Sequence, residues 1–127
     1  MMSVRQFFRS LSYALRGVRV VFQTEQSFRI QSSVAIVVIL AAIFFHVRWF
    51  EWVILLILIA SVLSLELINS IIERLVDAFK PRLHPVVHDV KDMMAGAVLL
   101  VSFVALIIGG IIFWPYVTPI VWVLVGG

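Results

Sequence analysis

The sequence predicts an all-α membrane protein in which three transmembrane helices follow an N-terminal amphipathic interfacial helix. Two observations come from composition: 63% of the 127 residues are hydrophobic, and only 13% are charged. The third observation is that three segments are apolar over the roughly 17 to 25 residues that a membrane-spanning helix needs. Because such a chain has no room for a separate soluble domain, we expect one domain over residues 1–127.

Residues 3–29 are expected to form the interfacial helix, because apolar side chains recur there at spacings of three and four. This apolar stripe consists of Phe7, Leu11, Leu15, Val18 and Phe22. Arginines occupy the other faces, so the helix can lie on the bilayer with its cations toward anionic headgroups. We expect no nucleic-acid partner, since the basic residues are spread along a helix that leads directly into a membrane span.

The three membrane helices are predicted at about residues 30–47, 52–79 and 93–114. A short turn that contains two tryptophans joins the first two, and tryptophan is suited to the headgroup layer. Pro81 ends the second helix, because proline cannot extend a helix and disfavours helical geometry in the residue before it. The segment after Pro115 is too short to cross the membrane again, so we expect it to be interfacial or packed against the bundle.

The basic residues predict the orientation, since arginine and lysine in short loops are retained on the cytoplasmic side. They are abundant in the N-terminal helix and in the 74–92 connection, whereas the turn between the first two spans contains only Arg48. We therefore expect a multi-pass protein with its N-terminus and its second connection in the cytoplasm. The acidic and basic residues near these segments can then meet a cytosolic solute.

The segment SLELINSIIERLVD, residues 64–77, contains the most informative polar side chains. An acid inside a membrane helix costs on the order of 2.5 kcal/mol or more, and it usually faces a bundle interior or a water-filled cavity. Glu66 is therefore a functional candidate. At roughly 100° per residue, Glu73 and Asp77 fall close to Glu66 on one face, with Asn69 beside them. The helix is expected to present a polar stripe that runs from the membrane toward the cytosol.

Aligned carboxylates and Lys91 at a membrane surface suit phosphoryl transfer. Mg²⁺ prefers oxygen ligands, commonly one or two carboxylates together with nucleotide phosphates, and a lysine contacts phosphate as a point charge. A buried carboxylate such as Glu66 is suited to taking a proton from a hydroxyl group. The chain lacks the GxxxxGK[ST] loop and the protein-kinase motifs, which excludes those two solutions. It also lacks cysteine, which excludes thiolate chemistry.

These residues also provide a family resemblance. The ExxNSxxExxxD pattern from Glu66 to Asp77, followed by Lys91-Asp92 and by Ala95-Gly96-Ala97-Val98, resembles the prokaryotic diacylglycerol kinase family, which includes undecaprenol kinases. Matching residues upstream are Tyr13, Gly17, Arg19, Thr24-Glu25 and Phe28-Arg29. The resemblance covers about residues 5 to 110 without an evident gap, and its ExxNSxxExxxD core is specific.

The resemblance implies a lipid kinase of the bacterial cytoplasmic membrane, with its active site on the cytoplasmic side. Glu66 would be the general base that activates the hydroxyl of diacylglycerol or undecaprenol, with support from Asn69. Glu25 and Glu73 would bind the Mg²⁺ that accompanies ATP, and Asp77 would be either a structural acid or a solvated helix end. Contacts to the nucleotide are implied for Lys91, Asp92, Arg9, Tyr13, Arg82 and His84. The family is trimeric, so the resemblance implies a homotrimer.

Two other functions stay open from the residues alone. A proton-coupled small membrane transporter could use Glu66 as its proton carrier, but this leaves the rest of the polar stripe without a role. A holin-like membrane protein without catalysis would need only the amphipathic N-terminus and helix-packing glycines. Gly96, Ala97, Gly109 and Gly110 are expected to permit close packing of the third span.

Overall fold

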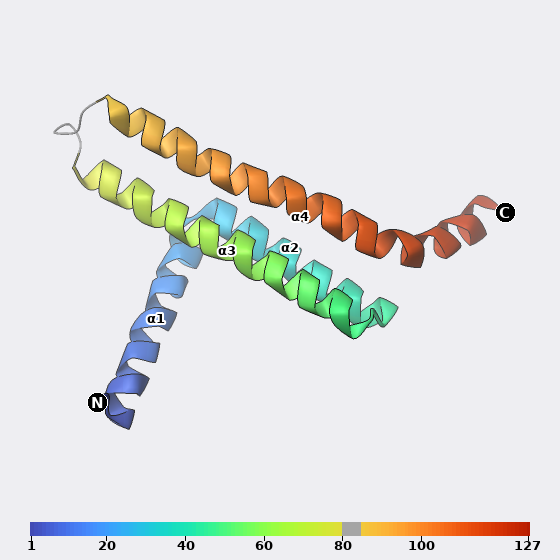
Figure 1. Cartoon of the computed structure of the whole chain (residues 1–127), viewed down its shortest axis with the longest axis horizontal. Coiled ribbons are helices and arrows are strands. Elements are labelled where there is room, and N and C mark those ends of the chain that lie inside the picture. Colours follow the sequence, from blue (N-terminus) through green and yellow to red (C-terminus); the bar gives the residue numbers. More distant parts are fainter. Residues whose placement is uncertain (80–84) are drawn as a thin grey trace.

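The computed structural model describes residues 1–79 and 85–127, and these residues form four helices. In chain order they are α1 (Val4–Thr24), α2 (Gln26–Phe45), α3 (Trp49–Ala78) and α4 (Val86–Val125). Figure 1 shows that α2 and α4 run along α3, whereas α1 leaves the bundle at a steep angle. The last three helices are long and apolar enough to cross a membrane, which confirms the predicted fold class.

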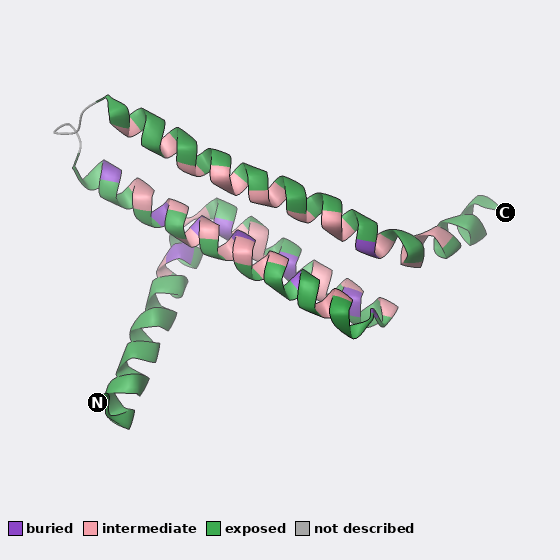
Figure 2. Cartoon of the chain, in the orientation of Figure 1, coloured by how far each residue is buried: buried purple, intermediate pink, exposed green. Residues whose placement is uncertain are grey.

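Helix α1 begins with a capping box. The Ser3 hydroxyl accepts a hydrogen bond from the Gln6 amide at 3.2 Å, and the Gln6 side chain accepts one from the Ser3 amide at 2.8 Å. These bonds satisfy two of the amide groups that a helix start leaves without partners. Almost all of α1 is exposed, and Val21 is its one buried residue (Figure 2). All five residues of its apolar stripe are exposed, although the Phe22 ring also packs against Phe28, and this exposure agrees with an interfacial helix.

The first helix ends at Thr24 rather than at residue 29, and α2 starts directly after Glu25. Glu25 has an extended backbone, with φ −110° and ψ 113°, which breaks the helix between the two elements. The Arg29 guanidinium stabilises this break, since it donates to the carbonyl oxygens of Phe22 and Gln23, both at 2.9 Å. Carbonyl groups in a last helical turn lack partners within their own helix. Arg29 of α2 therefore caps α1 and sets the direction in which α1 leaves.

The turn between α2 and α3 is tighter than predicted, because α3 already begins at Trp49. His46 adopts a left-handed conformation with φ 53°, which ends α2 in the manner usual for a helix C-terminus. At the start of α3, the Glu51 carboxylate accepts a hydrogen bond from the Arg48 amide at 3.0 Å. An acid in the first turn also interacts favourably with the helix dipole.

Helix α4 is longer than the predicted third span at both ends. It starts at Val86, after Pro85, and proline is well tolerated at a helix start because its missing N–H would have no partner there. It also continues through Pro115 and Pro119 to Val125. These two internal prolines bend the helix instead of ending it. The bend is visible in Figure 1. Forty helical residues span about 60 Å, against about 30 Å of bilayer hydrocarbon, so α4 is about twice as long as a straight crossing of the membrane core requires.

The bent end of α4 is attached to the turn between α2 and α3. The Tyr116 hydroxyl donates a short hydrogen bond to Glu51, and the Tyr116 ring packs 5.8 Å from the ring of Phe45. Next to this contact lies the main buried core cluster, formed by Ala42, Val47, Leu55 and Ile112. We refer to this part of the bundle as the turn end, and to the part where α3 ends and α4 begins as the polar end.

Replacing Tyr116 by phenylalanine is expected to loosen the attachment of the α4 tail. Glu51 then loses a hydrogen-bond donor, and such a loss costs about 1 kcal/mol. The apparent melting temperature in detergent micelles should fall by a few degrees, and protease should cut the chain after Phe113 more quickly. Trp114→Phe is the control, since Trp114 is exposed beside the same bend. Equal melting temperatures for Tyr116→Phe and the wild type would contradict the role of this contact.

Candidate functional site

Glu66 is buried, with 4% of its surface exposed, in the second half of the membrane helix α3. The hydroxyl of Ser27 on α2 donates a hydrogen bond to its Oε2 atom at 3.1 Å. Ser70, one turn further along α3, is 2% exposed and extends the same buried polar face. The expectation that Glu66 faces the interior of the bundle is therefore confirmed. Because Ser27 occupies one oxygen, the other carboxylate oxygen has lone pairs for a second donor.

Asn69 and Glu73 follow Glu66 toward the polar end and are both half-buried. The Asn69 side-chain amide donates to Oε1 of Glu73 at 3.3 Å. This is an i, i+4 contact along one helix face, so Asn69 positions the carboxylate of Glu73 one turn away. The predicted polar stripe is present, and its exposure increases from Glu66 through Glu73 to Asp77.

Glu25 lies at the junction of α1 and α2, where it is half-buried. Its neighbour Thr24 accepts a hydrogen bond at 2.6 Å from the guanidinium of Arg74, which follows Glu73 in α3. This contact joins segments 50 positions apart in the chain. It therefore brings the parts of the backbone that contain Glu25 and Glu73 to the same side of the polar end.

Lys91 connects α4 to α3 at the polar end. Its ammonium group lies 3.3 Å from Oδ1 of Asp77, in an ion pair whose side chains are 29% and 59% exposed, respectively. An exposed pair of this kind contributes little to stability, typically about 0.2–1 kcal/mol. Asp92, the next residue, is exposed. The pair keeps one cationic group beside the polar stripe, and Asp77 neutralises part of its charge.

Two of the remaining predicted nucleotide contacts, Arg9 and Tyr13, lie on α1. Arg9 and Tyr13 are exposed on α1, and Tyr13 is about 16 Å along the helix from Thr24. Figure 1 shows that α1 leaves the bundle, so this helix runs away from the stripe on its own α3. Arg82 and His84 lie outside the described residues.

The described carboxylates near the polar end are too few to hold a cation without further ligands. Among residues 1–79 and 85–127, no group of three or more histidine, cysteine, aspartate or glutamate side chains could hold a metal ion by itself. Glu25 and Glu73 are the two carboxylates on either side of the Thr24–Arg74 contact. One or two carboxylates are what Mg²⁺ usually takes from a protein when a nucleotide supplies the other ligands.

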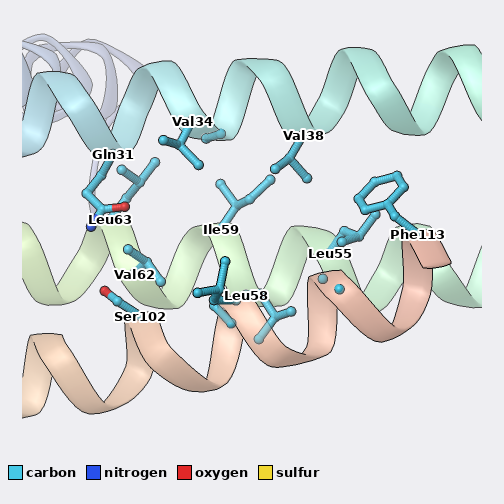
Figure 3. A pocket seen from close by; sticks show the side chains of 15 residues that line it. Gln31, Val34, Val38, Leu55, Leu58, Ile59, Val62, Leu63, Ser102 and Phe113 are labelled. Carbon is cyan, nitrogen blue, oxygen red and sulfur yellow. The ribbon is translucent and has the colours of Figure 1, made fainter. Parts of the chain in front are cut away.

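A groove of about 470 Å³ lies between α2, α3 and α4, and nothing in the sequence patterns predicted it. Figure 3 shows its two ends, with Gln31, Leu63 and Ser102 at one and Leu55 and Phe113 at the other. Two of the glycines expected to pack helices line this groove instead, and a Cβ atom at Gly109 or Gly110 would meet no atom within 4 Å. Among the described residues these glycines are not packed against another helix, and their role in packing stays a prediction. The one sequence feature that could have indicated this groove is the hydroxyl of Ser102, which lies within an apolar run.

The fold and the site define a small helical membrane protein with a buried carboxylate at the start of a polar stripe. The family described as prokaryotic diacylglycerol kinase matches residues 12–113, and the chain belongs to this family of membrane lipid kinases. The undecaprenol kinase of Bacillus subtilis is 35% identical over 112 residues, which cover 88% of this chain and 91% of that protein.

Two diacylglycerol kinases are also similar. The one from Synechocystis is 36% identical over 107 residues, which cover 84% of this chain but 61% of that protein. The one from Escherichia coli K12 is 28% identical over 108 residues, covering 85% of this chain and 88% of that protein. The chain is thus an enzyme of the lipid-kinase class. Relatives named undecaprenol kinase and relatives named diacylglycerol kinase both resemble it over most of its length.

Proposed function

We propose that the protein transfers the γ-phosphoryl group of MgATP to the hydroxyl of a membrane lipid alcohol, diacylglycerol or undecaprenol, with Glu66 as general base. The burial of Glu66 inside a membrane helix, with Ser27 bonded to only one of its oxygens, is the observation that supports this most directly. A lipid hydroxyl lies at the headgroup layer, and a carboxylate just inside that layer can reach it. The related undecaprenol kinase and diacylglycerol kinases support the two acceptors.

In this mechanism the acceptor hydroxyl donates its hydrogen bond to the Glu66 oxygen that Ser27 leaves available. Glu66 takes the proton as the hydroxyl oxygen forms a bond to the γ-phosphorus, and the bond between that phosphorus and ADP breaks. Phosphoryl transfer needs chiefly positioning and stabilisation of charge. Asn69 contributes by holding Glu73, and Ser27 contributes by fixing the orientation of the base.

Charged groups at the polar end would bind the nucleotide. Glu25 and Glu73 would hold Mg²⁺, which supplies charge neutralisation to the phosphates when bound. Lys91 and Asp92 would contact the nucleotide from α4. The remaining contacts are proposed for Arg9, Tyr13, Arg82 and His84.

We propose a homotrimer in which these contacts come from more than one subunit. The position of Arg9 and Tyr13 on an α1 helix that points away from its own stripe supports this, because α1 could reach a neighbouring copy (Figure 1). Helix α3 also has an exposed face with Ala60 and Ser64 four residues apart, and small residues at this spacing favour helix association in membranes. The excess of basic residues near the N-terminus supports a site on the cytoplasmic side of the bacterial inner membrane.

A phosphorylation assay in mixed micelles tests this function. Purified protein is incubated with γ-labelled MgATP and either diacylglycerol or undecaprenol, and the label is then counted in the lipid phase. We expect label in the lipid phase with at least one acceptor and none without lipid. Absence of lipid label with both acceptors, in protein that is folded by circular dichroism, would refute the kinase and favour the proton-coupled transporter, which uses no ATP.

A further inference from the structure

The last residue of α1 is hydrogen-bonded to α3 at the polar end. The Arg74 guanidinium donates to the Thr24 hydroxyl oxygen at 2.6 Å, and the Thr24 hydroxyl donates in turn to the Val20 carbonyl oxygen at 2.8 Å. A hydroxyl group has one proton to donate, and its oxygen has lone pairs that accept. Both bonds therefore form at the same time, and they fix the Thr24 side chain between α1 and α3.

Each partner in the Thr24–Arg74 bond is next to one of the two carboxylates that we propose as Mg²⁺ ligands. Glu25 follows Thr24, and Glu73 precedes Arg74. Adjacent Cα atoms in a chain are about 3.8 Å apart, so the bond acts on the backbone directly beside both carboxylates. The separation of Glu25 and Glu73 thus depends on how α1 is held against α3.

A second arginine holds the same end of α1. Arg29 of α2 donates to the carbonyl oxygens of Phe22 and Gln23, both at 2.9 Å. Arg29 joins α1 to α2, the next helix in the chain, whereas Arg74 joins α1 to α3. Cations at a helix C-terminus also interact favourably with the helix dipole. Because α1 meets the bundle at this end and runs outward from it (Figure 1), these two arginines determine the direction of the helix.

We propose that Arg74 is a positioning residue, which through Thr24 sets the separation of Glu25 and Glu73 and thereby the affinity of the site for Mg²⁺. This inference rests on the proposed kinase function. Arg74 does not ligate the metal itself, because a guanidinium group has donors but no acceptor. Residues that orient metal ligands without touching the metal typically change the metal affinity by about 10- to 100-fold.

The variant Thr24→Val tests this role, because valine is close to threonine in shape but cannot accept a hydrogen bond from Arg74. The measurement is the rate of lipid phosphorylation in a Mg²⁺ titration at fixed ATP. We expect the half-saturating Mg²⁺ concentration to rise by about tenfold, the lower end of the range for indirect metal partners, with kcat at saturating Mg²⁺ unchanged. Thr24→Ser is the matched control, since serine keeps the hydroxyl group and should keep the wild-type titration.

The variant Arg74→Met removes the other partner of the same bond, and we expect it to shift the titration to the same extent. The double variant of Thr24→Val and Arg74→Met should shift it no further, because two changes that remove one interaction are not additive. Arg16→Met is the control for the loss of an arginine, since Arg16 is exposed on α1 about two turns before the junction and should keep the wild-type titration.

Three outcomes overturn the positioning role. The first is an unchanged titration in Thr24→Val, and the second is a fall in kcat at saturating Mg²⁺ without a shift of the titration, which is the result expected from general damage to the fold. The third is a larger shift in Arg74→Met than in Thr24→Val, because Arg74 then acts on the nucleotide phosphates directly rather than through Thr24.

Direct binding of Mn²⁺ separates this inference from the kinase activity. Mn²⁺ takes carboxylate and other oxygen ligands, as Mg²⁺ does. Binding is measured without lipid, from the water-proton relaxation of Mn²⁺ with a non-hydrolysable ATP analogue. We expect weaker binding in Thr24→Val than in the wild type, and wild-type binding in Thr24→Ser. Equal affinities in Thr24→Val and the wild type overturn the positioning role even if the wild type phosphorylates lipid. Absence of lipid phosphorylation by a wild type that binds Mn²⁺ refutes the kinase alone.

Discussion

The variant Glu66→Gln is expected to abolish lipid phosphorylation while leaving the protein folded. Glutamine has nearly the same shape as glutamate and retains an oxygen that can accept the Ser27 hydrogen bond. It cannot take a proton from the acceptor hydroxyl, and loss of general base catalysis typically lowers turnover by about 10²- to 10⁴-fold. The measurement is kcat in mixed micelles at saturating MgATP and lipid, with the oligomeric state checked by size-exclusion chromatography.

Glu51→Gln is the matched control for this prediction. Glu51 is also an acid on α3, but it lies at the turn end, where it contacts Arg48 and Tyr116. We expect its turnover to stay close to that of the wild type, because glutamine there can still accept both hydrogen bonds. Near-wild-type turnover in Glu66→Gln would exclude Glu66 as the base, and equal losses in both variants would indicate a general effect of replacing acids on α3.

Long apolar runs were sufficient to predict the membrane helices, and the cost of an acid within such a run was sufficient to predict the burial of Glu66. The ends of the helices were predicted less well. Pro115 was expected to interrupt α4, yet proline within a helix removes one backbone hydrogen bond and bends the axis without ending the element. The end of α1 depends on Arg29, whose bonds to the preceding helix have no counterpart in a local pattern.

The contacts that assemble the site could not be predicted, because they join distant parts of the chain. Ser27 and Glu66 are 39 positions apart, and Thr24 and Arg74 are 50 positions apart. Such pairs depend on how α2 and α1 pack against α3, and no spacing within one helix encodes that packing. The same reasoning applies to Gly109, whose open space depends on three helices together.

The variant Glu73→Gln is expected to raise the Mg²⁺ concentration that the enzyme needs. Glutamine keeps the oxygen that Asn69 contacts at 3.3 Å, so the local hydrogen bond can persist, but it removes a negative charge that suits a divalent cation. Even indirect ligand partners change metal affinity by about 10- to 100-fold, so we expect the half-saturating Mg²⁺ concentration to rise by roughly tenfold or more. The measurement is the rate of lipid phosphorylation in a Mg²⁺ titration at fixed ATP.

The variant Asp77→Asn is the control for Glu73→Gln. It tests whether the change in Mg²⁺ requirement comes from losing a metal ligand or from losing any acid on the same stripe. Asp77 is exposed and paired with Lys91, and a surface pair is worth at most about 1 kcal/mol, which corresponds to less than about fivefold in an equilibrium constant. High Mg²⁺ should restore activity in Glu73→Gln but not in Glu66→Gln, since added cation can compensate for weak binding but not for a missing base. If Asp77→Asn shifts the Mg²⁺ titration more than Glu73→Gln does, Asp77 is the metal ligand, and the cation lies one turn closer to the end of α3.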